Sequence, residues 1–206
     1  MKVVGVILAG GQSSRMGGGD KSLLYLGGRT VLARVIDRLD AQVEAMVLNA
    51  NGDPARFSGY GLPVVADSIA GFAGPLAGVL VGMDWAYEQG ADYIVTVAAD
   101  TPFFPQHLLT ALQMAREPKN SALVMAVTPD HERKFARHPT FGLWSVDLRE
   151  DLRAALNAGV RKVVQWTEPH GCAQVAFNFD GGDPFFNVNT PEDMAVARNM
   201  LQEFDG

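Results

Sequence analysis

The chain has 206 residues, 48% of them hydrophobic, so it can bury one substantial core, and we expect a single domain over residues 1–206. The formal net charge of -6 argues against a broad nucleic-acid-binding surface, because proteins with such a surface carry an excess of Lys and Arg. The only cysteine, Cys172, excludes an internal disulfide framework and favours a location in the reducing cytoplasm.

Short apolar runs predict buried strands, and segments with apolar residues at helical spacing lie between most of them. The predicted strands cover residues 3–8, 45–48, 64–66, 93–98 and 123–127. This alternation is typical of a mainly parallel sheet covered by helices. We therefore expect an α/β fold, a single-domain three-layer sandwich with a Rossmann-like sheet. The first run is too short to span a bilayer, and no contact with a membrane is expected.

Capping residues and periodicity predict four helices. The first is capped by Thr30, and the second begins at Pro75, a proline suited to the first helical position, and ends by Gly90. The third covers residues 105–116. The last begins at Thr190, which is followed by a proline and two acidic residues, and ends near Phe204.

The second half of the chain is less regular. Residues 129–138 are rich in charge and lack periodicity, so we expect a loop or hairpin that projects from the sheet. Beyond it we expect a strand near residues 140–144, helical spacing at residues 148–156 and another apolar segment at residues 160–166.

A glycine-rich segment from Leu8 to Lys21 directly follows the first strand. Its five glycines let backbone N–H groups approach a phosphate chain, and Arg15 and Lys21 add positive charge. Asp20 stands where a Walker A loop needs glycine, and no G-x-G-x-x-G fits, which disfavours a P-loop ATPase and a Rossmann dehydrogenase. A solvated surface loop is the alternative. Its position after a strand favours a ligand site, because ligands of open α/β sheets gather at the carboxyl ends of strands.

Three polar residues stand at the ends of other predicted strands: Asn49, Asp67 and Asp100. Their convergence at one edge of the sheet favours a site. The Asp100 carboxylate is a suitable oxygen ligand for Mg2+, which binds few protein groups and otherwise takes phosphate and water oxygens. An ordinary role in a turn or a cap is the alternative for each of the three.

The loop resembles the L-A-G-G-x-S-x-R-M-G-x-x-K signature of nucleotidyltransferases, and the whole chain resembles the molybdenum cofactor guanylyltransferases nearly end to end. The loop alone indicates only the superfamily, and the combination with further motifs narrows it. Those motifs are Asn49, Asp67-Ser68, Gly74-Pro-Leu-Ala-Gly78, Asp100-Thr-Pro102, Arg137-His-Pro-Thr140 and Phe186-Asn-Val-Asn-Thr-Pro-Glu-Asp193.

The resemblance implies a fold of the nucleotide-diphospho-sugar transferase type and the transfer of GMP from GTP to the terminal phosphate of molybdopterin, with release of pyrophosphate. It assigns the amino-terminal part to GTP and Mg2+, and the carboxy-terminal part to the pterin. The implied GTP contacts are Leu8, Ala9, Gly10, Lys21, Asn49, Asp67 and Asp100, with Asp100 also on Mg2+. Arg15, Lys21 and Asp100 are the implied catalytic residues, and Gly18, Asn187 and Asn189 lie on the pterin side.

This reaction needs no general base, because a phosphate monoester has a second pKa of about 6 and is largely ionised at neutral pH. Two alternatives stay open: CMP transfer to the same pterin or another phosphorylated acceptor, and a non-catalytic nucleotide-binding adaptor. The presence of Arg15, Lys21 and Asp100 together argues against the adaptor. Besides GTP and molybdopterin, we expect transient contacts with cofactor-inserting proteins or molybdoenzyme chaperones, and no nucleic acid.

Among the histidines only His138 is a functional candidate, because Arg137-His138-Pro139 joins the charged segment to a strand, within reach of an anionic second substrate. A solvent-facing place at the base of a hairpin is the alternative. Phe185 and Phe186 are expected to pack against the last strand, with pterin stacking as the alternative.

Overall fold

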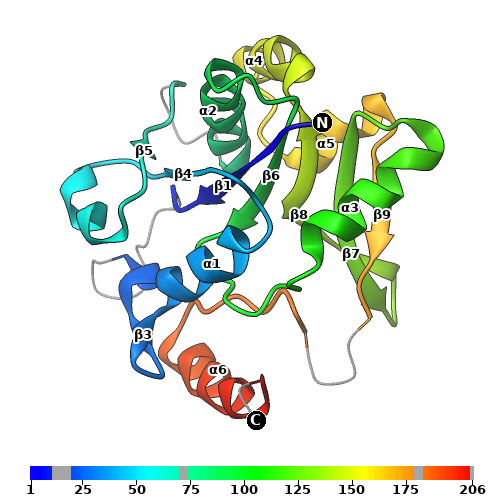
Figure 1. The fold of residues 1–206 in the computed structure, drawn as a ribbon. Coiled ribbons are helices and arrows are strands. Elements are labelled where there is room, and N and C mark those ends of the chain that lie inside the picture. Colours follow the sequence, from blue (N-terminus) through cyan, green and yellow to red (C-terminus); the bar gives the residue numbers. More distant parts are fainter. Residues whose placement is uncertain (11–19, 70–73, 179–182, 205–206) are drawn as a thin grey trace.

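The computed structural model describes residues 1–10, 20–69, 74–178 and 183–204, and Figure 1 shows the ribbon. Within these ranges a seven-stranded sheet has the order β5-β4-β1-β6-β8-β7-β9. Its strands are β1 (Val3–Leu8), β4 (Met46–Asn49), β5 (Val64–Val65), β6 (Tyr93–Ala98), β7 (Leu123–Asp130), β8 (Lys134–Ser145) and β9 (Ala173–Ala176). Pairing is parallel except that β8 runs antiparallel to β6 and β7. The mainly parallel sheet predicted from the sequence is confirmed.

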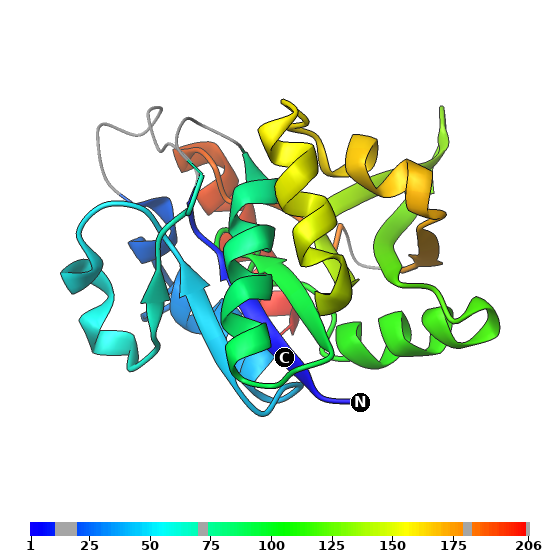
Figure 2. The same ribbon diagram turned by 90° about the horizontal axis from the view of Figure 1, so that it is seen from above.

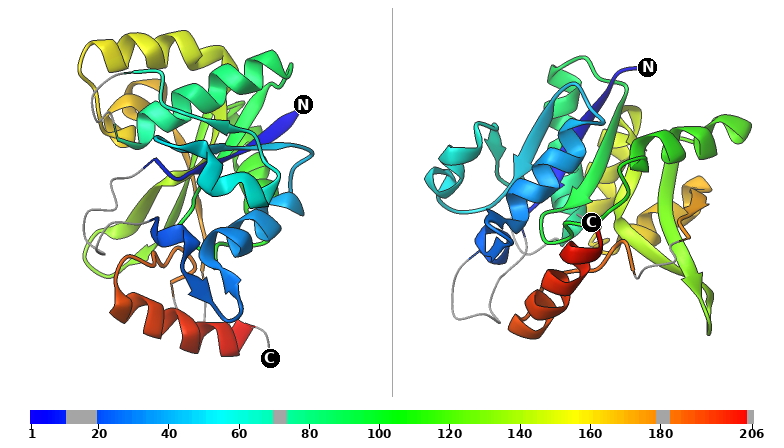
Figure 3. Two further views of the ribbon diagram at one scale, coloured as in Figure 1. Left: turned by 90° about the vertical axis from the view of Figure 1, so that its left-hand side faces the viewer. Right: turned by 60° about the horizontal axis from the view of Figure 1, so that its bottom comes forward.

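Helices cover both faces of this sheet and give the predicted three layers. One face carries α1 and α3, and the other carries α2, α4 and α5, as the top view and the side view show (Figures 2 and 3). The helices are α1 (Val31–Asp40), α2 (Pro75–Glu88), α3 (Leu108–Arg116), α4 (Arg149–Asn157), α5 (Val163–Thr167) and α6 (Pro191–Phe204). The 3-10 turns are η1 (Lys21–Leu23), η2 (Pro54–Tyr60), η3 (Glu117–Lys119), η4 (Val146–Leu148) and η5 (Glu168–His170). None of the described helices is long and apolar enough to cross a membrane.

The carboxy-terminal helix α6 lies apart from the main layers, below the small hairpin of β2 (Tyr25–Leu26) and β3 (Arg29–Thr30), as Figures 1 and 3 show. A separate apolar cluster joins it to the rest of the chain. The buried members of this cluster include Leu26, Val31 and Phe103 from the first half and Met194 and Ala197 from α6. The end of the chain is thereby fixed next to the segment that follows the glycine-rich loop.

The second half of the chain confirms one sequence prediction and departs from the sequence analysis at one strand. The charged segment forms a hairpin, because β7 continues to Asp130 and β8 begins at Lys134, and Asp130 accepts backbone hydrogen bonds within the turn. The hairpin alternative is therefore confirmed. Strand β9 was not predicted, because its side chains alternate between partly buried and exposed and form no apolar run.

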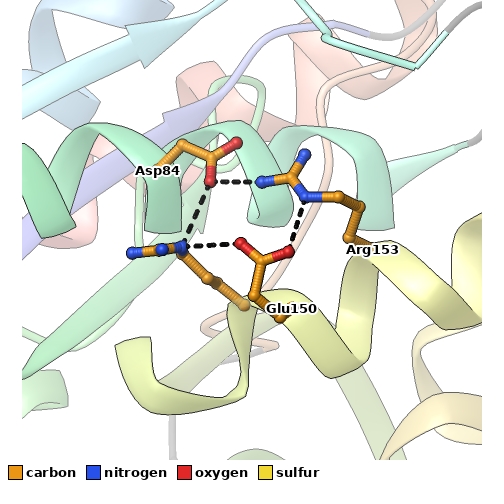
Figure 4. A network of polar contacts seen from close by, with 4 residues as sticks. Asp84, Glu150 and Arg153 are labelled. Atoms are coloured by element: carbon orange, nitrogen blue, oxygen red, sulfur yellow. Dashed lines mark hydrogen bonds and ion pairs between the residues drawn. The ribbon is translucent and has the colours of Figure 1, made fainter.

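In the helical layer formed by α2, α4 and α5, a polar network joins α2 to α4 (Figure 4). Nη2 of Arg153 lies 2.6 Å from the Asp84 carboxylate, and Nε of Arg149 lies 3.0 Å from Glu150. Arg153 and Glu150 close the ring of contacts at 3.1 Å. Such partly exposed pairs stabilise only modestly, so apolar packing carries most of the stability of this layer.

Helix α2 packs closely on the sheet because two of its buried positions are glycines, Gly78 and Gly82. A Cβ atom at Gly82 would lie 2.7 Å and 2.8 Å from the two Cγ atoms of Val6 in β1, closer than carbon atoms approach. The glycine therefore sets the distance between α2 and the central strand.

We predict that Gly82→Ala lowers the free energy of unfolding by roughly 1–3 kcal/mol, because the added methyl group forces α2 away from Val6. Urea denaturation of the purified protein measures this. Gly59→Ala is the matched control, since a Cβ atom there meets nothing within 4 Å. Equal stability of the two variants would contradict the close packing of α2.

Candidate functional site

A cleft of about 480 Å³ lies at the carboxyl ends of β1, β4 and β6. All seven residues that the sequence assigns to GTP line it, and so do Asn187 and Asn189 from the carboxy-terminal segment. The structure thus brings together residues that are up to 181 positions apart, from Leu8 to Asn189. Arg15 and Gly18 lie outside the described residues. The roles of the individual side chains stay predictions.

The alignment of the strand ends explains why the cleft forms here. Leu8 at the end of β1 pairs with Asn49 of β4 on one side and with Ala98 of β6 on the other. The ladder continues one residue further, because the N–H of Ala9 donates to Asn49 at 2.8 Å and the N–H of Ala99 donates to Leu8 at 3.0 Å. The three chain segments therefore leave the sheet at the same level.

One wall of the cleft holds the Asp67 carboxylate between two amides. Nδ2 of Asn49 donates to Oδ1 of Asp67 at 2.9 Å, and Nδ2 of Asn51 donates to Oδ2 at 2.8 Å. The N–H of Asp67 donates back to Oδ1 of Asn51 at 2.9 Å. Asn51 was missed in the sequence, where only its place two residues after Asn49 was visible. The carboxylate is thus held in one orientation.

Two glycines leave room for this wall. A Cβ atom at Gly10 would lie 3.1 Å from Oδ1 of Asn49, and one at Gly78 would overlap with the same oxygen. Asn49 is 2% exposed, so its side chain has no space to move aside. Gly10 and Gly78 therefore allow β1 and α2 to approach the amide that holds Asp67.

The opposite wall contains Asp100 and the carboxy-terminal segment. The hydroxyl of the buried Thr101 donates to Oδ1 of Asp100 at 3.2 Å and contacts Oδ1 of Asn187, while the N–H of Val188 donates to the Asp100 carbonyl at 2.8 Å. Burial raises the pKa of Asp100, and the Thr101 hydrogen bond and nearby Lys21 lower it in part. A buried carboxylate of this kind favours a cation beside it.

Lys21 also lines the cleft, and its Nζ donates to Oδ1 of Asn189 at 3.3 Å. The cap of α6 fixes Asn189, because the Asp193 carboxylate accepts the N–H groups of Asn189 and Thr190, each at 2.9 Å. In return the N–H of Asp193 donates to the Thr190 hydroxyl at 3.1 Å. The predicted cap of the last helix is confirmed, and it places a cleft residue.

A bulge in β8 puts Thr140 into the cleft. Ala126 pairs with His138 whereas its neighbour Met125 pairs with Gly142, so residues 139–141 have no partners in β7. Thr140 lines the cleft. The expected strand at residues 140–144 is thus the second part of β8, beyond an irregularity that the sequence did not indicate.

Arg137 and His138 point to different sides of the hairpin, and neither lines the cleft. Nη1 of Arg137 lies 3.5 Å from Glu168, beside a smaller pocket of about 190 Å³ that also contains Cys172. Burial raises the pKa of the Cys172 thiol to about 11, so this thiol is protonated at neutral pH. The described lining of the cleft contains neither Arg137 nor His138, and a contact of His138 with a second substrate stays a prediction.

His138 packs in the interior side of the hairpin base. Its ring stacks on Phe185 with 4.2 Å between the ring centroids, and Nε2 lies 2.9 Å from the Thr128 hydroxyl. Phe185 lies in a segment without regular structure and is 3% exposed. Its ring also contacts Phe141 of β8. Burial lowers the pKa of His138, and Asp183 partly opposes this shift. Phe185 therefore packs mainly against β8 rather than the last strand, and Phe186 packs against the apolar cluster of α6.

The family model of the MobA-like NTP transferase domain matches residues 5–172. The chain belongs to this family. A molybdenum cofactor guanylyltransferase of Bradyrhizobium sp. is 49% identical over 201 residues, which cover 96% of this chain and 92% of that protein. A protein of the same name from Mesorhizobium japonicum is 46% identical over 97% of this chain and 96% of its own length.

Two solved structures share the fold at low sequence identity. Molybdopterin-guanine dinucleotide biosynthesis protein A of Archaeoglobus fulgidus has a TM-score of 0.75 at 21% identity and covers 97% of this chain and 99% of its own. The 4-diphosphocytidyl-2C-methyl-D-erythritol synthase of Anaerococcus prevotii has a TM-score of 0.76 at 16% identity, over 98% and 96%. These neighbours confirm the nucleotide-diphospho-sugar transferase type of fold.

The lowered pKa of His138 predicts a loss of stability in acid. The unfolded chain takes up a proton near pH 6.5 and the folded chain resists it, so below that pH the unfolded state binds more protons and the melting temperature falls. His138→Gln keeps a hydrogen-bonding group near Thr128 but does not titrate. We expect the melting temperature of the wild type to fall more steeply than that of His138→Gln between pH 7.5 and pH 5.

The control for this experiment is His131→Gln, at an exposed position in the hairpin turn. Its melting curve is expected to follow the wild type over the same pH range. Parallel pH profiles of the wild type and His138→Gln would contradict the assigned role of burial at His138.

Proposed function

We propose that the chain transfers GMP from GTP to the terminal phosphate of molybdopterin and forms pyrophosphate and the guanine dinucleotide form of the cofactor. Relatives with 45–49% identity over nearly the whole chain carry the name molybdenum cofactor guanylyltransferase. The structural observation that supports this function most directly is that one cleft combines both sets of predicted residues. Its described lining includes Asn49 and Asp67, Asn187 and Asn189, and Lys21, which donates a hydrogen bond to Asn189.

The proposal places the guanine at the Asp67 wall. A carboxylate repels a phosphate chain but accepts hydrogen bonds, and guanine carries two adjacent donors, N1–H and the 2-amino group, on one ring edge. Each oxygen of Asp67 already accepts one amide hydrogen and keeps a second acceptor site for a ligand. Gly10, which lines the cleft beside Asp67, has no side chain that would obstruct a base there. The fixed carboxylate therefore suits the recognition of a base that donates.

The triphosphate then extends toward Lys21. The hydrogen-bond partner of Lys21 is the neutral amide of Asn189, so its positive charge stays available for a phosphate oxygen. Lys21 also lies close enough to lower the pKa of Asp100. A cation and a metal-binding carboxylate at one place suit the α-phosphate and the leaving pyrophosphate.

Asp100 is the residue we propose for Mg2+. Among the described side chains only Thr101 donates a hydrogen bond to its carboxylate, which leaves further oxygen lone pairs for a cation. Mg2+ typically takes one or two carboxylates and completes its shell with phosphate oxygens and water, and this donor set fits. When bound there, Mg2+ supplies neutralisation of the phosphate charge.

In the proposed reaction an oxygen of the acceptor phosphate forms a bond to the α-phosphorus of GTP, and the bond to the β-phosphate breaks. The acceptor is largely ionised at neutral pH, since its second pKa is about 6, so no protein base is needed. The contribution of the chain is to align two anions and to offset their repulsion. Asn187 and Asn189 provide amides for the acceptor side.

Two further parts of the proposal concern the cell. We place the reaction in the reducing cytoplasm, where the lone Cys172 stays a thiol. We also propose transient contacts with the cofactor-inserting proteins or molybdoenzyme chaperones that receive the product. CMP transfer and a non-catalytic adaptor are the alternatives that the next experiment separates.

We predict that pyrophosphate release in the presence of Mg2+ and molybdopterin occurs with GTP and not with ATP, CTP or UTP. The physical reason is that guanine presents two adjacent donors, N1–H and the 2-amino group, to the two oxygens of Asp67, whereas adenine and cytosine present one amino donor beside an acceptor nitrogen. Release of pyrophosphate with CTP would instead support CMP transfer. Nucleotide binding without pyrophosphate release would support the non-catalytic adaptor.

We predict that Lys21→Ala and Asp100→Ala each lower kcat for pyrophosphate release by about 100-fold or more, because each removes charge stabilisation at the reacting phosphates. Neither change is expected to lower the melting temperature appreciably, since Lys21 lines an open cleft and Asp100 is a partly buried charge in the same cleft. Lys119→Ala, at an exposed site in η3, is the control with unchanged kcat. Full activity of either cleft variant would remove its proposed role.

A further inference from the structure

We propose that Arg56 is a positioning residue that couples the phosphate side of the cleft to its base side. This inference rests on the proposed function, because it takes one nucleotide to span both sides. Arg56 lies in η2, outside the sequence motifs of the site, and does not itself line the cleft. Its side chain nevertheless joins two segments that do.

The guanidinium of Arg56 binds three different acceptors at once. Its Nε forms an ion pair with Asp20, the residue before Lys21. Its Nη2 donates to the carbonyl of Asn51 at 2.6 Å, and its Nη1 donates to the carbonyl of Asp53. The side chains of Arg56 and Asp20 are 28% and 18% exposed, so solvent screens this pair less than a surface pair.

A continuous series of hydrogen bonds leads from Arg56 to the wall of the cleft that holds Asp67, which we call the base wall. Arg56 holds the backbone of Asn51, and the Asn51 side chain makes two hydrogen bonds with Asp67, at 2.8 Å to its carboxylate and at 2.9 Å from its N–H. The orientation of the Asp67 carboxylate therefore depends on the position of Asn51, and through it on Arg56.

On the other side Arg56 controls the charge next to Lys21. Asp20 lies in the cleft lining, where a free carboxylate would repel a triphosphate or compete with it for Lys21. The ion pair with Arg56 offsets the negative charge of the Asp20 carboxylate. Arg56 thus keeps the Lys21 ammonium available for phosphate.

The core fixes the position of Arg56 itself. Its guanidinium lies 4.4 Å from the ring centroid of Phe57, which is 1% exposed and belongs to the main core cluster. The hydroxyl of Tyr60, at the end of η2, lies 2.8 Å from that of Thr30, the cap of α1. A planar, forked guanidinium on a fixed base can hold several acceptors, which a lysine ammonium cannot do in the same way.

The experiment measures the affinity of the full chain for GTP and for ITP, each with Mg2+ and without an acceptor, by isothermal titration calorimetry. ITP lacks the 2-amino group, so the GTP-to-ITP ratio reports the base wall. We expect Arg56→Gln to bind GTP about 10-fold more weakly, the size typical of losing charge-assisted hydrogen bonds, and to lower the GTP-to-ITP ratio as well. Arg56→Lys should regain part of the GTP affinity through Asp20 but not the ratio.

The matched control is Arg29→Gln, which breaks another Arg–Asp ion pair, with Asp37, away from the cleft. It should leave both affinities unchanged, and thermal unfolding confirms that each variant is folded. Wild-type GTP affinity in Arg56→Gln, or a weaker affinity with an unchanged ratio, would overturn the coupling. A wild-type GTP affinity and GTP-to-ITP ratio in Arg56→Lys would show that the forked guanidinium is not needed. This variant also tests the coupling if Arg56→Gln fails to fold.

The failure of this inference is distinguishable from that of the proposed function. The binding measurements need no acceptor, so they test Arg56 even if molybdopterin is not the second substrate. In the full reaction we expect Arg56→Gln to raise KM for GTP about 10-fold with a smaller change in kcat, because Arg56 touches no reacting atom. A loss confined to kcat would contradict a positioning role.

Discussion

The site depends on the parallel pairing of β1 with β4 and β6, in which Leu8 lies level with both Asn49 and Ala98. Because this register aligns the three strand ends, the glycine-rich segment, the base wall and Asp100 leave the sheet side by side. A shift of one residue in any of these strands would turn its side chains to the opposite face. Close packing of α2 through Gly78 and Gly82 holds the same three strands in place.

The second half of the chain completes the cleft from the other side. Asn187 and Asn189 follow no strand of the sheet and are held instead by contacts with Thr101 and Lys21 and by the cap of α6. Since α6 packs against residues that directly follow the glycine-rich loop, both substrate sides share one apolar cluster. Two anions can thus be held at a fixed distance, which is the main requirement of a transfer between phosphates.

Among the described residues that line the cleft, Lys21 alone carries a positive charge. The chain as a whole carries a formal charge of -6, so the attraction of a triphosphate depends on local cations. Within the described cleft, Lys21 has a neutral amide partner, while Asp20 is occupied by Arg56 from outside. Asp67, the acidic group of the base wall, accepts hydrogen bonds from two amides and suits a base that donates. This separation of charges gives the two ends of the nucleotide different environments.

Local signals in the sequence determined the strands β1, β4 and β6, the capped helices, the glycine-rich segment and Asp100 at a strand end, because apolar periodicity, caps and glycine runs act over a few residues. The family resemblance added the prediction that Asn187 and Asn189 lie on the side of the second substrate. Tertiary structure alone decided the rest: the half-exposed β9, the bulge that turns Thr140 into the cleft, the separation of Arg137 from His138, and the contacts of Asn51 and Arg56. These features arise from pairings between distant segments, whose register and side-chain contacts no local pattern records.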